Sequence, residues 1–326
     1  MKKILYTVCS ANHLAHCKTM TDAFLQFHQD YEVIIGLVDR IDGRFDASFF
    51  QPCELVEAHQ LGIQDFEQLA IQYTILELNC AMKVFMAQYI FRKYNPHILL
   101  YLDSDIDVMH PLNEVEEALD EKDILLTPHF LTPLPDADRL PRERDILRSG
   151  IYNAGFMAFR QSAQVDVFLD WWAKHMRTEC FYNFAEGMGV DQVWLNLVPL
   201  FFDRVGVWKH PGANVAYWNI HERSLSRNEN VVFVNKQYPL LFLHISGYQF
   251  NEPEQISRHQ NRYTMAEQPV LAELLNNYQN RVMANGYESF SEMQCVFAKP
   301  VKKSKGIMKK LNSWLMPLGI KLVKTH

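Results

Sequence analysis

An uninterrupted apolar run from Ile98 to Leu102 ends abruptly at the acidic triplet Asp103-Ser104-Asp105. Such a run is typical of a buried strand that leaves the core at its carboxyl end, where open α/β sheets bind their ligands. Two carboxylates two residues apart repel each other unless a cation lies between them, and a divalent metal is the usual one. Such an ion also links carboxylates to a diphosphate. The triplet therefore predicts a metal–phosphate site, and the alternative is a solvated acidic turn.

The segments before the triplet alternate between strand and helix patterns. Ile4–Val8 and Val33–Val38 are predicted strands, and Thr19–His28 between them carries apolar residues at helical spacing. Residues 72–93 form a longer helical pattern that stops at Asn95-Pro96. This β-α-β order predicts an α/β fold with a mainly parallel sheet flanked by helices. The later pattern predicts strands at 123–127, 151–160 and 240–246 and helices at 165–176 and 270–282.

The composition is that of an ordinary globular protein. The 326 residues are 48% hydrophobic and 21% charged, and no apolar run is long enough to span a bilayer. The six cysteines are scattered singly, which excludes a zinc knuckle or a dithiol motif and favours reduced thiols. We expect residues 1–298 to form one domain, with a long Pro-rich loop at 128–145. The net charge of −6 argues against nucleic acid as a partner of this domain.

The C-terminal residues 299–326 have a different character. They contain eight lysines and no Asp, Glu or Arg, and Ile307, Leu311, Trp314 and Leu318 recur at helical spacing. A basic amphipathic helix of this kind lies in the interface of an anionic membrane. The tail therefore predicts a cytoplasmic protein bound peripherally to the inner face of the cytoplasmic membrane. The alternative is a helix that packs back on the domain.

Four segments in a fixed order resemble the GT-A glycosyltransferases of family 8 and their bacterial relatives: YLDSDIDV, YNAGFMAF, GVDQVWLN and LFLHISGY. The resemblance covers about residues 1–250 and implies a GT-A fold, in which a Rossmann-like mixed sheet is mainly parallel. It implies a metal site made by Asp103, Asp105 and His244. Oxygen and nitrogen ligands together suit Mn²⁺, with Mg²⁺ as the other candidate. Without the resemblance, a lone histidine at a strand end is more often structural.

The resemblance also implies a reaction centre. Asp191 would orient hydroxyls of the donor sugar, and Gln192 would lie on the face where a retaining mechanism needs stabilisation. The residues alone also fit a helix N-terminus, where an aspartate interacts favourably with the helix dipole. Asn153 would contact the donor sugar, with Gly155 allowing close approach of the backbone. The alternative for Asn153 is a turn residue at a strand end.

The remaining donor contacts are implied in the same way. Ser10 and Asn12 follow the first strand, where the family holds the nucleobase and ribose. Lys83 lies on a helix that faces phosphates or sugar in the family, although a solvated helix lysine is the alternative. The family pattern then continues to a lysine that neutralises the leaving diphosphate, where this chain has Tyr248-Gln249-Phe250. Two further residues complete the implied donor-binding set: Ser104 and Gly247.

A polar and aromatic segment at residues 210–225 supplies candidates for the acceptor side. Trp218 would stack on a sugar face, and His221 or Glu222 would contact the acceptor. The expected function is metal-dependent transfer of a sugar, a hexose from a UDP donor, to a hydroxyl of lipopolysaccharide, capsule or a lipid-linked acceptor, with retention. A nucleotidyltransferase acting on a sugar phosphate is one alternative, although no glycine follows the first strand. A non-catalytic glycan-binding module is the other.

Overall fold

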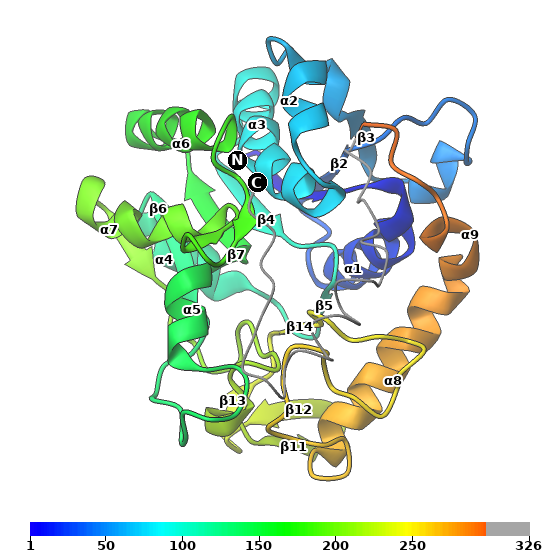
Figure 1. Ribbon diagram of the computed structural model, residues 1–326, viewed down its shortest axis with the longest axis vertical. Coiled ribbons are helices and arrows are strands. Elements are labelled where there is room, and N and C mark those ends of the chain that lie inside the picture. The colour runs from blue at the N-terminus through cyan, green and yellow to red at the C-terminus, as the bar shows by residue number, and fades with distance from the viewer. Residues whose placement is uncertain (298–326) are drawn as a thin grey trace, which may run out of the picture.

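The computed structural model describes residues 1–297, and its centre is a seven-stranded sheet with the order β10-β6-β7-β4-β1-β2-β3 (Figure 1). The strands are β1 Lys3–Cys9, β2 Glu32–Leu37, β3 Glu54–Glu57, β4 Ile98–Leu102, β5 Ile106–Val108, β6 Ile124–Pro128, β7 Tyr152–Arg160, β8 Tyr182–Asn183, β9 Met188–Gly189, β10 Val205–Val207, β11 Leu225–Asn228, β12 Val231–Val234, β13 Tyr238–Pro239 and β14 Phe242–His244. The helices are α1 Leu14–Phe27, α2 Phe66–Gln72, α3 Ile75–Tyr94, α4 Asn113–Glu121, α5 Glu143–Ser149, α6 Ala163–Met176, α7 Val198–Phe201, α8 Pro269–Ala284 and α9 Tyr287–Ser291.

The sheet is mixed but mainly parallel, as the β-α-β order predicts. Strand β1 runs parallel to β2 and β4, β2 runs parallel to β3, and β10 runs parallel to β6. Strand β7 lies between β4 and β6 and is antiparallel to both. The carboxyl ends of β1, β2 and β4 therefore meet at one edge of the sheet, and the triplet follows directly from β4 at that edge.

Helices cover both faces of the sheet, because successive side chains of a strand point to opposite faces. Leu5 and Leu100 belong to the core under α1, α4 and α8, whereas Ile4 and Leu99 belong to the core under α2, α3 and α6. Figure 1 shows α1 and α8 on one side of the molecule and α3 next to α6 on the other. With apolar layers on both faces, the central strands are buried along their whole length, as the run before the triplet predicts.

The helix predicted at 72–93 begins later than expected. Thr74 caps α3, with its side chain and that of Glu77 each accepting a hydrogen bond from the other residue's backbone N–H. This capping box separates α3 from the shorter α2. At the other end, Asn95 adopts a left-handed conformation with φ of +48°, and Pro96 follows. The capped helix places Lys83 in the third turn of α3, on the side that packs against the sheet.

A two-stranded ladder outside the main sheet brings two distant segments together. Strand β14 pairs antiparallel with β5, which sets His244 opposite Ile106. The backbone N–H of Ile245 donates to the carbonyl of Asp105 at 2.9 Å. The ladder therefore places His244, which is 139 positions after Asp105 in the chain, beside the acidic triplet.

The predicted loop at 128–145 is irregular up to residue 142, after which α5 begins. Arg262 holds it, since its Nη1 donates to Asp136 Oδ2 at 2.5 Å and its Nη2 donates to the carbonyls of Arg139 and Pro141 at 3.2 Å. The tail predicted at 299–326 lies outside the described residues. Within residues 1–297, no helix has both the length and the apolarity needed to cross a bilayer.

Candidate functional site

Three predicted metal ligands converge at the carboxyl edge of the sheet. Asp103 and Asp105 lie in the turn between β4 and β5, and His244 ends β14. One ligand atom from each lies within 4.8 Å of the other two. His244 Nε2 is 3.3 Å from Asp105 Oδ1 and 3.7 Å from Asp103 Oδ2. Ser104 is buried between the two aspartates, so the turn directs both carboxylates to one side.

Two asparagine side chains orient the imidazole of His244. Its Nδ1 lies 3.0 Å from Asn153 Oδ1 and 3.2 Å from Asn214 Oδ1, two oxygens that can only accept. The Nδ1 atom therefore carries the proton, which leaves Nε2 directed at the carboxylates as a potential ligand. Gly155 makes room for the ring, because a Cβ there would lie 2.3 Å from His244 Cε1. The glycine thus serves close packing against His244.

The charges of this group are mutually dependent. Burial favours the neutral form of His244, but the carboxylate of Asp105 outweighs it and raises the histidine's pKa. Burial would likewise raise the pKa of Asp105, yet the facing His244 holds it well below its usual value. Two carboxylates and an imidazole nitrogen with a fixed tautomer form a donor set that fits Mn²⁺ or Mg²⁺.

Lys83 is buried and joins the triplet to the predicted reaction centre. Its Nζ is 3.0 Å from Asp103 Oδ1 and 3.0 Å from Asp191 Oδ2, and it donates to the carbonyl of Ala154 at 3.1 Å. Burial disfavours the ammonium, but the two carboxylates outweigh it and hold the pKa of Lys83 well above its usual value. The alternative of a solvated helix lysine is therefore wrong, and Lys83 is a charged bridge between the two aspartates.

The predicted pair Asp191-Gln192 lies beside this bridge. Asp191 precedes the 3-10 helix η4 (Gln192–Leu197), but its side chain makes no capping hydrogen bond and turns to Lys83 instead. Burial raises the pKa of Asp191 despite the nearby ammonium. Gln192 Oε1 accepts from the backbone N–H of Ala154 at 3.3 Å and from Asn153 Nδ2 at 3.4 Å. The amide of Gln192 is thereby fixed against the strand that carries Asn153.

The predicted nucleotide residues lie at the end of β1, on the same edge. Ser10 Oγ donates to Asn12 Oδ1 at 2.8 Å and accepts from Asn79 Nδ2 of α3 at 3.0 Å. Gly247 lies in the turn after β14 with φ of +74°, a conformation that favours glycine. These residues follow β1 and β14, the strand that carries His244, and their contact with a donor remains a prediction.

One functional residue was not expected, one has a different role from the expected one, and one expectation was wrong. The unexpected residue is Tyr101, which donates its hydroxyl to Asp103 Oδ1 at 2.5 Å. Asn214, in the segment expected to supply the acceptor side, orients His244 instead. Trp218 was expected to stack on a sugar, but it is buried and meets the His244 ring edge-on with centroids 5.1 Å apart. Glu222 accepts from the backbone N–H of Leu131 at 2.9 Å, so it braces the 128–142 loop. Segment 210–225 therefore packs against His244 and the 128–142 loop.

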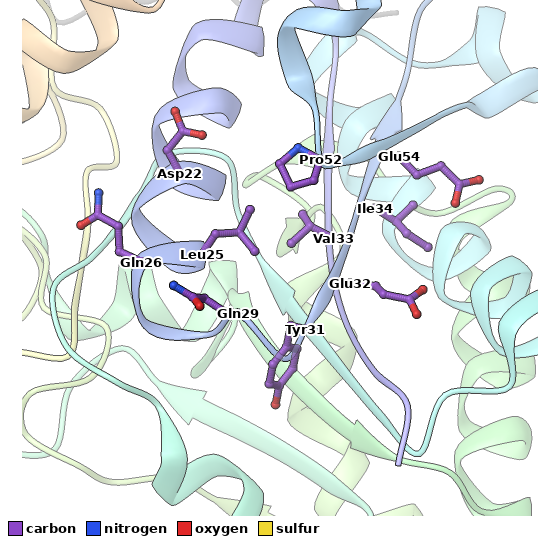
Figure 2. Close-up of a pocket in the computed structure, with 10 residues that line it drawn as sticks. All are labelled: Asp22, Leu25, Gln26, Gln29, Tyr31, Glu32, Val33, Ile34, Pro52 and Glu54. Atoms are coloured by element: carbon purple, nitrogen blue, oxygen red, sulfur yellow. The ribbon is translucent and has the colours of Figure 1, made fainter.

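A cavity of about 680 Å³ lies away from this group, between the end of α1 and the starts of β2 and β3 (Figure 2). Asp22, Glu32 and Glu54 contribute carboxylates to it, and Leu25 and Val33 contribute apolar surface. It opens at the amino ends of the parallel strands, the edge opposite to the triplet. We therefore assign it no part in the chemistry of the candidate site.

Comparisons with known proteins agree with the fold. No family model matches this chain. The protein YfnF of Bacillus subtilis (strain 168), described as uncharacterized, is 27% identical over 186 residues. The matched region is 55% of this chain and 59% of YfnF, so the chain spans less than two thirds of this curated relative.

Two solved glycosyltransferases superpose on the chain. The apo structure of WbbM, a bifunctional glycosyltransferase, gives a TM-score of 0.50 at 10% identity over 88% of this chain and 50% of WbbM. The glycosyltransferase GlyE of Streptococcus pneumoniae TIGR4 gives 0.48 at 14% identity over 90% of this chain and 66% of GlyE. At such identities the likeness to WbbM shows the fold alone. The mixed, mainly parallel sheet with its flanking helices is a GT-A glycosyltransferase fold, as expected from the sequence.

Proposed function

We propose that this protein is a metal-dependent glycosyltransferase that uses a nucleoside-diphosphate sugar as donor. One observation carries the proposal: Asp103, Asp105 and His244 converge beside the paired Lys83 and Asp191, at the edge of the sheet where α/β folds bind nucleotides. The GT-A fold supports it. Membership of glycosyltransferase family 8 remains part of the proposal.

Asp103, Asp105 and His244 would hold Mn²⁺ or Mg²⁺. When bound, such an ion supplies Lewis-acid stabilisation of the charge that grows on a departing diphosphate. The two aspartates are then ligands, with no role as general acid and base. Tyr101 and Lys83 both contact Oδ1 of Asp103, which fixes the carboxylate for this task.

The reaction centre would be formed by Asp191, Gln192 and Asn153. The ammonium of Lys83 favours the ionised form of the buried Asp191, whose carboxylate would accept hydrogen bonds from hydroxyls of the donor sugar. The fixed amide of Gln192 would face the sugar carbon whose positive character rises in the transition state. We propose retention of configuration on this basis and on the resemblance of the Asp-Gln pair.

We further propose a hexose from UDP as donor, with Ser10, Asn12, Ser104 and Gly247 around the nucleotide. The proposed acceptor is a hydroxyl of a surface glycan, such as lipopolysaccharide or capsule, or of a lipid-linked precursor. The basic tail at 299–326 would then hold the enzyme at the inner face of the cytoplasmic membrane.

The test is incubation with UDP-, GDP- and CMP-linked sugars and MnCl₂, with and without chelator, followed by chromatography of the released nucleotide. We expect one donor to be consumed only when metal is present. Release of pyrophosphate from a nucleoside triphosphate and a sugar phosphate would instead indicate a nucleotidyltransferase. Glycan binding with no donor consumed would indicate a binding module, and either result refutes the proposal.

A further inference from the structure

One bound divalent ion would balance the charges within the candidate site before any donor enters. Asp103, Asp105 and Asp191 bring three negative charges, and Lys83 together with one divalent ion would offset them. A nucleoside diphosphate adds negative charge, and that charge grows as the sugar departs. A further cation near the metal-ligand group would stabilise the leaving group.

The turn after His244 does not supply that cation, because residues 245–250 contain no lysine or arginine. Phe250 packs into an aromatic cluster, with ring centroids 5.5 Å from His16 and 4.7 Å from Tyr287. Tyr248 donates its hydroxyl to Gln279 of α8 at 3.0 Å. Both side chains anchor the turn to its neighbours, so a cation has to come from another segment.

A second segment packs directly on this turn, from the loop that joins β14 to α8 (yellow in Figure 1). Ser257 Oγ donates to the carbonyl of Ser246 at 2.9 Å, and the backbone N–H of Arg258 donates to the carbonyl of Gly247 at 3.0 Å. A Cβ at residue 247 would lie 2.4 Å from His259 Cδ2. The positive φ and the missing side chain of Gly247 therefore both serve this close contact.

Hydrogen bonds hold the same loop on either side of Arg258. Gln260 Oε1 accepts from the backbone N–H groups of Arg262 and Tyr263, both at 2.8 Å. Arg262 is buried and pairs with Asp136 across the 128–142 loop. A loop with this many internal hydrogen bonds holds its exposed side chains in a defined place.

Arg258 is the exposed side chain that this loop presents. Its Nε donates to His259 Nε2 at 3.1 Å, and within residues 1–297 neither terminal nitrogen of the guanidinium has a hydrogen-bond partner, so both can donate to a ligand. Within residues 1–297 it forms no ion pair with a carboxylate. A continuous run of rings leads back to the metal-ligand group, from His259 to Tyr217 at 5.7 Å, to Trp218 at 4.9 Å and to His244 at 5.1 Å.

We infer that Arg258 binds a phosphate of the leaving nucleoside diphosphate, and that His259 is the positioning residue for its guanidinium. The inference rests on the proposed function. A planar guanidinium with two free donor groups suits a phosphate, to which it can donate two parallel hydrogen bonds. The loop at 256–263 thus completes the diphosphate site from outside the sheet.

Calorimetric titration of the full-length protein with UDP, GDP and CDP, each with MnCl₂, identifies the diphosphate that the wild type binds. For that nucleotide we expect Arg258→Ala to weaken binding about 10- to 100-fold, the range for loss of a charge-assisted hydrogen bond or two. Arg258→Lys keeps the positive charge but lacks the two parallel N–H donors of the guanidinium. Its affinity for the diphosphate should therefore fall less than that of Arg258→Ala. Binding of the corresponding nucleoside monophosphate should change less than that of the diphosphate.

Arg227→Ala is the matched control, because it removes an equal charge from an exposed pair with Glu273 on α8. It should bind the diphosphate as the wild type does. Equal affinities for Arg258→Ala and the wild type, at equal unfolding midpoints, overturn the inference and leave the proposed function standing. If the wild type itself binds no nucleoside diphosphate with Mn²⁺, the proposed function fails and the inference fails with it.

Discussion

Replacing Lys83 with methionine tests the charged bridge at the centre of the site. The variant keeps the length and packing of the side chain but leaves the buried carboxylate of Asp191 without a cation. Removal of one partner from a buried ion pair costs about 3–5 kcal/mol, because the remaining charge is uncompensated. At this chain length each kcal/mol moves the thermal midpoint by roughly 2 °C, so we expect a fall of roughly 6–10 °C.

The second half of the test adds Asp191→Asn to Lys83→Met. The double variant no longer buries a lone carboxylate at residue 191, so it should regain a large part of the lost midpoint. Scanning calorimetry of the wild type, both single variants and the double variant gives the coupling directly. A Lys83→Met protein that melts within 1 °C of the wild type, or a double variant no more stable than Lys83→Met, would refute the reasoning.

Two further predictions concern the packing behind His244. Gly155→Ala places a methyl group 2.3 Å from the ring of His244, so we expect a folded protein whose Mn²⁺ affinity falls about 10- to 100-fold; unchanged affinity by calorimetry would contradict this. Burial lowers the pKa of His129 to about 4, so its neutral form is favoured by folding, and stability falls as the pH drops from about 6.5 towards 4. The loss should reach about 3 kcal/mol. Urea unfolding of His129→Gln should show a weaker pH dependence over that window, and equal slopes would exclude His129 as the cause.

The sequence indicates most of the architecture because the signals are local. An apolar run and a breaker such as Asn95-Pro96 each depend on a few adjacent residues, and they locate β4 and α3 to within three residues. The orientation of β7 is different, since antiparallel and parallel buried strands share the same apolar pattern. Its place between β4 and β6 follows from tertiary packing that no local signal records.

The residues of the site also differ in whether a local sequence signal indicates them. Asp103 and Asp105 lie two residues apart in the chain and stand out by their position after a buried strand. Lys83 is the only charged residue between positions 78 and 91 of α3, and only the packing of α3 against the sheet shows that it faces two carboxylates. Trp218 could not be distinguished from a sugar-stacking residue, because its burial depends on the ladder that carries His244.

The central claim is that Asp103, Asp105 and His244 hold a metal ion that binds the leaving diphosphate. Electron paramagnetic resonance of Mn²⁺ measures this directly, since the signal of the free ion disappears on binding. We predict one Mn²⁺ bound per chain, tighter in the presence of the nucleoside diphosphate that the protein prefers, and loss of that binding in Asp105→Asn. A wild-type protein that leaves the free Mn²⁺ signal unchanged with every nucleotide, or an Asp105→Asn variant that binds as tightly as the wild type, would contradict the account.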